Sequence, residues 1–95
     1  MINLTQRTYN EINTELAKRI ASLRKRKKLS QSELAKRSGV SFGSVKRFEQ
    51  TGEISLASLT KIAIALEVET ELDTLFSDVP FGSIEEVIHA QSQKH

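Results

Sequence analysis

The sequence predicts an all-α fold, and three features of its 95 residues support this prediction. Apolar residues recur at helical spacing, as in Ile12, Leu16, Ile20 and Leu23. Serines stand just before several apolar stretches, in positions where they can cap helices. No stretch has the alternating, β-branched pattern of a strand, and the chain has no internal repeat of solenoid length. We therefore expect a small bundle of helices.

The first expected helix spans residues 10–27, with residues 1–9 as an N-terminal arm. It ends in five consecutive cations, Arg24 to Lys28, which the partial negative charge of a helix C-terminus favours. Three further helix starts share one pattern: an apolar residue, a serine, and a second apolar residue four positions after the serine. The serine can accept a hydrogen bond from a free backbone N–H, and the apolar pair can form a hydrophobic staple. These starts are Leu29-Ser30 with Leu34, Val40-Ser41 with Val45, and Ile54-Ser55 with Leu59.

The second and third expected helices form a helix-turn-helix. Ser30 and Glu33 make a capping box at the start of the helix over 31–38, and Gly39 ends that helix because glycine readily adopts the left-handed conformation. The helix over 42–49 follows after only three residues, so the two helices must cross steeply. After a turn at Thr51 and Gly52, a helix over 56–66 is expected to bury one face formed by Leu56, Leu59, Ile62, Ala63 and Leu66.

The last expected elements are short. Thr70 is predicted to cap a fifth helix that contains Leu72, Leu75 and Phe76, and the helix-turn-helix domain is expected to cover residues 10–77. Residues 78–95 form a C-terminal tail in which Ser83 and Glu86 make another capping box, so a short tail helix is expected there.

Charge separates the two halves of the chain. Residues 1–50 hold 12 Lys and Arg against 4 Asp and Glu, a net +8, whereas residues 51–95 hold 2 against 8, a net −6. A basic half is typical of a nucleic-acid-binding protein, although a solvated basic helix gives the same count.

Cysteine is absent, and neither a leader peptide nor an apolar run of roughly 18 residues is present, so we expect a cytoplasmic protein without a membrane span.

Catalysis finds no support in the sequence. The two histidines, His89 and His95, lie in the tail without a paired nucleophile or a metal-ligand pattern, and no glycine-rich phosphate loop occurs. We therefore expect neither an enzyme nor a bound cofactor or metal.

The expected DNA-reading surface is the outer face of the helix over 42–49. Val45 and Phe48 should turn to the core with Val40, because they are three positions apart. Arg47 can then donate two hydrogen bonds to a guanine edge, and Lys46 can reach a base or a phosphate. The other expected contacts are Phe42 with a thymine methyl group, Gly43 through close backbone approach, Ser41 and Ser44 near the DNA backbone, and Gln31 with a phosphate.

Each of these residues also has a plainer interpretation. Lys46 and Arg47 could be an ordinary solvated face, and the ring of Phe42 could be a packing residue at the start of a helix. Ser41 could act only as a cap, and Ser44 and Gln31 could simply be solvated.

Taken together, these residues resemble the lambda repressor/Cro-like (Xre) helix-turn-helix family. The resemblance covers roughly residues 12–76 and implies a compact five-helix bundle whose third helix enters the major groove while the second crosses the DNA backbone. It implies a phosphate contact at Gln31, base contacts at Phe42, Gly43 and Arg47, and an ion pair between Arg24 and Glu49. Many members have polar residues where this chain has Phe42 and Gly43, so Arg47 carries more of the readout. The motifs are Leu29-Ser30-Gln31, Leu34-Ala35, Gly39-Val40-Ser41, Val45, Phe48-Glu49 and residues 59–66.

Residues 41–56 are also similar to the HipB-like subgroup, which consists of antitoxins that repress their own operon and bind a HipA-type kinase toxin. For DNA binding we expect a homodimer that places two copies of the helix over 42–49 in successive major grooves of a palindromic operator. The acidic second half of the chain and the tail at residues 81–88 would suit a protein partner or a second copy, although a frayed surface helix would give the same pattern. A different class of function stays open at this point. The same fold could be a protein-binding adaptor whose basic face meets an acidic partner, and an exposed Phe42 would suit that role.

Overall fold

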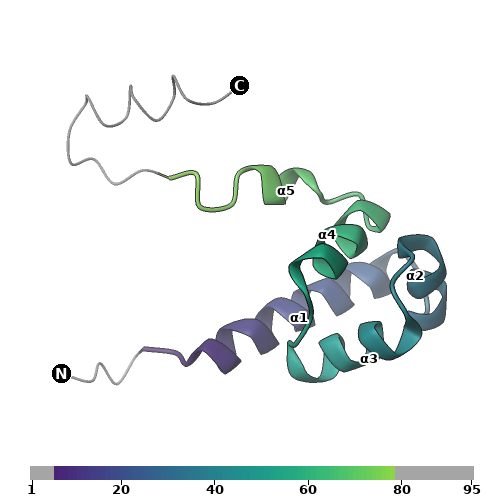
Figure 1. Cartoon of the computed structure of the whole chain (residues 1–95), viewed down its shortest axis with the longest axis horizontal. Helices are drawn as coiled ribbons and strands as arrows, with labels where there is room; N and C mark the ends of the chain where they lie inside the picture. Colours follow the sequence, from purple (N-terminus) through teal and green to yellow (C-terminus); the bar gives the residue numbers. More distant parts are fainter. Residues whose placement is uncertain (1–5, 79–95) are drawn as a thin grey trace.

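Residues 6–78, which a computed structural model describes, fold into five α-helices without a β-strand (Figure 1). The all-α prediction is therefore confirmed, whereas the expected tail helix lies outside the described residues. None of the five helices is both long and apolar enough to cross a lipid bilayer. The helices are α1 (Tyr9–Arg26), α2 (Gln31–Ser38), α3 (Phe42–Thr51), α4 (Leu56–Ala65) and α5 (Thr70–Asp73).

Hydroxyl side chains cap the first four helices. Ser30, Ser41 and Ser55 each accept a hydrogen bond from the backbone N–H three residues later, as the sequence pattern predicts. The Glu33 carboxylate also accepts from the Ser30 N–H at 2.9 Å, which completes the predicted capping box. The cap of α1 is Thr8, which accepts from Glu11 N–H, so this helix covers 9–26 rather than 10–27.

Left-handed glycines end α2 and α3. Gly39 has φ +74° and Gly52 has φ +79°, and their N–H groups donate to Ala35 O and Phe48 O. The two glycines differ in their surroundings, because a Cβ on Gly39 would meet open space whereas a Cβ on Gly52 would lie 2.8 Å from the carbonyl carbon of Asn13. The end of α3 therefore rests directly on the backbone of α1. Helix α3 continues two residues beyond the predicted end at residue 49.

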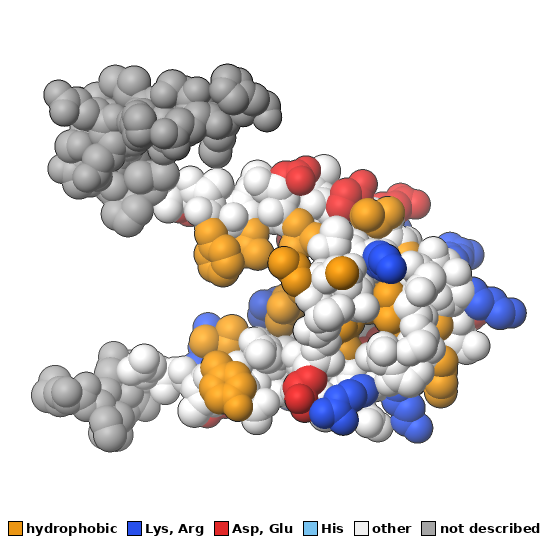
Figure 2. Space-filling model, viewed as in Figure 1, with side chains coloured by type: hydrophobic (Ala, Val, Ile, Leu, Met, Phe, Trp, Pro, Cys, Tyr) orange, Lys and Arg blue, Asp and Glu red, His pale blue; other side chains and the backbone are white. Residues whose placement is uncertain are grey.

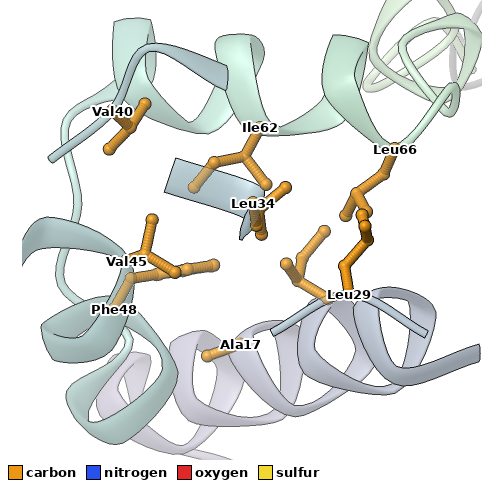
Figure 3. Packing of buried hydrophobic residues seen from close by; sticks show 9 residues of the cluster. Ala17, Leu29, Leu34, Val40, Val45, Phe48, Ile62 and Leu66 are labelled. Atoms are coloured by element: carbon orange, nitrogen blue, oxygen red, sulfur yellow. The ribbon is translucent and has the colours of Figure 1, made fainter. Parts of the chain in front are cut away.

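The core lies between α1, α2, α3 and α4. Helix α1 packs against α3, and α2 packs against both α3 and α4. Figure 3 shows the buried side chains pointing toward one another from these four helices and from the segments that join them. The predicted inward positions of Val40, Val45 and Phe48 are confirmed. The cluster consists of Ala17, Ile20, Leu29, Leu34, Val40, Val45, Phe48, Ile62 and Leu66.

The structure corrects the prediction around α4 and α5. Leu56 is 73% exposed instead of facing the core, because α4 reaches the cluster only through residues further along the helix. Thr70 is the first residue of α5 rather than its cap, and Glu69 in the cap position makes no side-chain cap hydrogen bond. Leu75 and Phe76 follow the helix and are exposed, and Phe76 has φ +59°, which is incompatible with a continuing helix.

Candidate nucleic-acid interface

Helix α3 presents one apolar face to the core and one polar face to solvent. Val45 and Phe48 are buried beneath it, whereas Lys46, Arg47 and Gln50 are exposed on its outer side. The predicted site residues Ser41, Phe42, Gly43 and Ser44, which form the cap and first turn, are exposed as well. The structure thus leaves all of these predicted residues accessible on α3 and its cap.

The first turn of α3 is ordered by its own hydroxyl groups. Ser41 Oγ accepts from Ser44 N–H at 3.1 Å and donates to Ser44 Oγ at 2.8 Å. The ring of Phe42 is 49% exposed beside them. A Cβ on Gly43 would meet nothing within 4 Å, so this backbone is open to the approach of a large ligand.

We expect Gly43→Ala to raise the free energy of unfolding by about 0.5–1 kcal/mol, because alanine removes the entropic cost of a glycine inside a helix and its methyl group has room. Urea denaturation followed by circular dichroism would measure this gain. If DNA approaches this backbone closely, the same variant should bind DNA more weakly despite its higher stability. A variant that gains stability and keeps its full DNA affinity would contradict a close approach at Gly43.

Arg24 and Glu49 form a bidentate ion pair beneath the outer face of α3. Arg24 Nε donates to Glu49 Oε2 at 2.7 Å and Arg24 Nη2 donates to Glu49 Oε1 at 3.0 Å. Arg24 Nη1 also donates to Leu29 O at 2.7 Å. The side chains are 10% and 7% exposed, so the pair connects α1, the start of the helix-turn-helix and α3 inside the protein.

Gln31 joins this pair from α2. Its Nε2 donates to Glu49 Oε1 at 2.9 Å, so part of the amide turns inward rather than toward a ligand. An amide nitrogen carries two hydrogens, and the second remains for a phosphate oxygen. Arg24, Gln31 and Glu49 together are called the ion-pair network below.

The ion-pair network keeps Glu49 charged. Burial raises the pKa of this carboxyl group, but hydrogen bonds from Arg24 and Gln31, together with the charges of Arg24 and Lys25, lower it by more. The net pKa is below the ordinary value of 4.5. At neutral pH the carboxylate is therefore ionised and paired with a cation, so its repulsion of a nearby phosphate is largely neutralised.

Arg47 contacts a second carboxylate, which lies just beyond the C-terminal end of α3. Its Nη2 lies 3.1 Å from Glu53 Oε2, and the two side chains are 64% and 63% exposed. This pair is a surface contact, and the guanidinium still faces solvent.

A groove of about 520 Å³ lies beside α3, between the outer side of α1 and the start of α2. Two of its lining residues, Lys18 and Lys25, are exposed cations of α1. These two lysines were not among the predicted site residues, although Lys18, Ser22 and Lys25 have the i, i+4, i+7 spacing of one helix face. The groove is lined by Lys18, Ala21, Ser22, Arg24, Lys25, Gln31, Glu49 and Gln50.

The side of the molecule formed by α4 and α5 differs from the α3 side in the charge and polarity of its exposed residues. Figure 2 shows acidic side chains along the α5 side and basic ones toward α2 and α3. Apolar side chains line both sides of the opening between α4–α5 and the first half of α1 in this view. The exposed apolar residues of these segments are Tyr9, Ile12, Leu56, Ile64, Leu75 and Phe76.

Comparison with known families gives a match over the helix-turn-helix region. A family model described as helix-turn-helix matches residues 20–72, more than half of the chain. The matched region includes the ion-pair network, the whole of α2, α3 and α4, and the turns between them. No curated protein and no solved structure gives a significant match.

Proposed function

Because the chain belongs to the Xre-like helix-turn-helix family, we propose that it is a transcriptional regulator that binds duplex DNA sequence-specifically through α3. The observation that carries this proposal is the division of α3 into two faces. Val45 and Phe48 hold the helix on the core, and Lys46 and Arg47 project from the opposite side. A helix held in this way can enter a major groove with its cations toward the base edges.

Phosphate contacts would come from the elements beside α3. The start of α2 presents backbone N–H groups and Gln31 toward an approaching strand, and the groove along α1 adds Lys18 and Lys25. Such contacts supply most of the affinity for DNA of any sequence. Base contacts by Arg47 then supply the preference for one sequence.

A homodimer is the proposed active form, and autorepression is the proposed outcome. Ile64, Leu75 and Phe76 are exposed apolar residues on or just after α4 and α5, and contact with a second copy would remove them from water. Two copies of α3 would then meet successive major grooves about 34 Å apart on a palindromic operator. A dimer on an operator at its own promoter would block the polymerase.

A narrower proposal assigns the chain to a toxin–antitoxin module as the antitoxin of a HipA-type kinase. It is supported by the similarity of residues 41–56 to the HipB-like subgroup and by the acidic, partly apolar side formed by α4 and α5. Such a side is chemically distinct from the basic DNA side. The antitoxin could therefore bind a protein and an operator at the same time.

Arg47→Ala tests the proposed function. In a gel-shift titration with DNA from upstream of the chain's own gene, we expect this variant to lose about 1–3 kcal/mol of binding free energy for the preferred sequence, because it removes a bidentate base contact. Lys61→Ala, which removes one positive charge from α4, is the control and should change the affinity little.

The outcomes separate the rival functions. An Arg47→Ala variant that weakens binding to all sequences equally would contradict a base-reading role for Arg47. Wild-type protein that forms no sequence-specific complex would contradict DNA recognition itself and favour a protein-binding adaptor.

A further inference from the structure

Glu53 is an acidic residue at a place where a DNA-binding surface would normally avoid one. It lies two residues after the last residue of α3, is exposed, and contacts Arg47. We propose that Glu53 is a specificity-determining residue: it disfavours a contact between Arg47 and a phosphate, and it leaves Arg47 able to contact a base edge. This inference rests on the proposed function, because it concerns how α3 tells bases from the DNA backbone.

The backbone at Glu53 is fixed independently of the ion pair. Thr51 Oγ1 donates to Arg47 O at 2.7 Å and accepts from Glu53 N–H at 3.1 Å. Between them, Gly52 is buried in the left-handed conformation against Asn13. The chain is thus folded back at the end of α3, so that the Glu53 side chain starts beside Arg47 in every copy of the protein.

The contact leaves Arg47 able to bind a base. A guanidinium carries five N–H donors in a planar fork, and the single contact with Glu53 involves only Nη2. The remaining donors can still reach the O6 and N7 acceptors of a guanine. Holding a long side chain in one place also reduces the conformational freedom that it loses on binding.

The same carboxylate penalises a phosphate at Arg47. A phosphate oxygen bound to the guanidinium would lie within a few ångströms of Glu53, and two like charges repel at that distance even in water. A guanine edge is neutral and meets no such repulsion. Glu49 does not act in this way, because it is buried and paired with Arg24 on two atoms. Glu53 therefore lowers the affinity for DNA of any sequence more than the affinity for the preferred sequence. The difference between the two affinities is larger as a result.

The test compares two duplexes. A preferred sequence is first selected from a random 20-base-pair library with the wild-type protein, and Kd is then measured for it and for a scrambled duplex at one salt concentration. We expect Glu53→Gln to bind the scrambled duplex about fivefold more tightly and to lower the ratio of the two affinities by a similar factor, corresponding to one like-charge contact. The salt dependence for the scrambled duplex should steepen by about 0.9, one additional phosphate contact.

Two controls separate a local effect from a change in net charge. Glu71→Gln removes an equal charge from α5 and should change both affinities alike. In an Arg47→Ala background, Glu53→Gln should change both affinities alike, as Glu71→Gln does, because the guanidinium that Glu53 contacts has been removed. Thermal melting by circular dichroism verifies that each variant is folded.

An unchanged affinity ratio in Glu53→Gln, or an equal change in Glu71→Gln, would overturn the role of Glu53 and leave the proposed function standing. If the wild-type protein selects no preferred sequence, the proposed function itself is overturned, and the role of Glu53 with it.

Discussion

Glu49→Ala is expected to lower the free energy of unfolding by about 3–5 kcal/mol, because it leaves the Arg24 guanidinium buried without a counter-charge. The Gln31 amide would lose its acceptor at the same time. Urea denaturation followed by circular dichroism would measure the loss. The matched control is Glu53→Ala, which breaks an exposed pair and should cost no more than about 1 kcal/mol. Equal losses in the two variants would show that the buried pair stabilises the fold no more than the exposed pair does.

The same residue gives stability a dependence on pH. The pKa of Glu49 is lower in the folded protein than in the unfolded chain, so the carboxylate stabilises the fold fully above its unfolded pKa. This contribution is lost as the pH falls through the folded pKa. We expect the difference in stability between wild type and Glu49→Gln to be constant near neutral pH and to shrink below the ordinary value of 4.5. A difference that stays constant down to the most acidic pH at which both proteins fold would contradict this linkage.

Gly52→Ala is expected to be the most damaging of the glycine substitutions. Two costs combine there: the left-handed conformation, about 1–2 kcal/mol for a residue with a Cβ, and a methyl group 2.8 Å from the carbonyl carbon of Asn13. Because that atom belongs to the backbone of α1, it cannot move aside as a side chain could. Overpacking of this kind adds about 1–3 kcal/mol.

Gly39→Ala is the matched control, because Gly39 has nearly the same φ but open space around it. It should cost only the conformational part, about 1–2 kcal/mol. The difference between the two variants measures the close contact between α3 and α1. If both lose the same stability in urea denaturation, that contact relaxes without cost.

Helix boundaries were predictable where one residue type meets a local requirement of the backbone, such as a hydrogen bond to a free N–H group or a left-handed conformation. Ser30, Ser41 and Ser55 satisfy a backbone N–H within their own turn, and Gly39 adopts a conformation that costs other residues energy. These signals depend on a few neighbouring positions, so the sequence alone identifies them. The buried faces of α2 and α3 follow from spacing in the same way.

The exposure of apolar residues on and after α4 was predicted less well, because it depends on what packs against them. Leu56, Leu75 and Phe76 are apolar and correctly spaced for a core, yet no described helix covers them. Thr70 is a good cap by residue type, but the turn before it already has helical backbone at Glu69. Neither fact can be derived from composition or periodicity.

The candidate site shows the same contrast. The outer face of α3 follows from its period, whereas the groove beside α1 depends on how α1, α2 and α3 meet in space. The inward turn of Gln31 depends on the same packing, as does the contact between Arg47 and Glu53 across six residues.

Helix α3 is anchored at its start by the Ser41 cap, in its last turn by Glu49, and at its end by Gly52 on Asn13. Because α3 is held at three points, its backbone loses little conformational entropy when a ligand binds. For the proposed function this means rigid-body docking, in which only long side chains without a partner in the free protein, such as Lys46, become ordered. Complexes formed in this way differ mainly in how long they last, so operator and random DNA should be encountered at similar rates and released at very different ones.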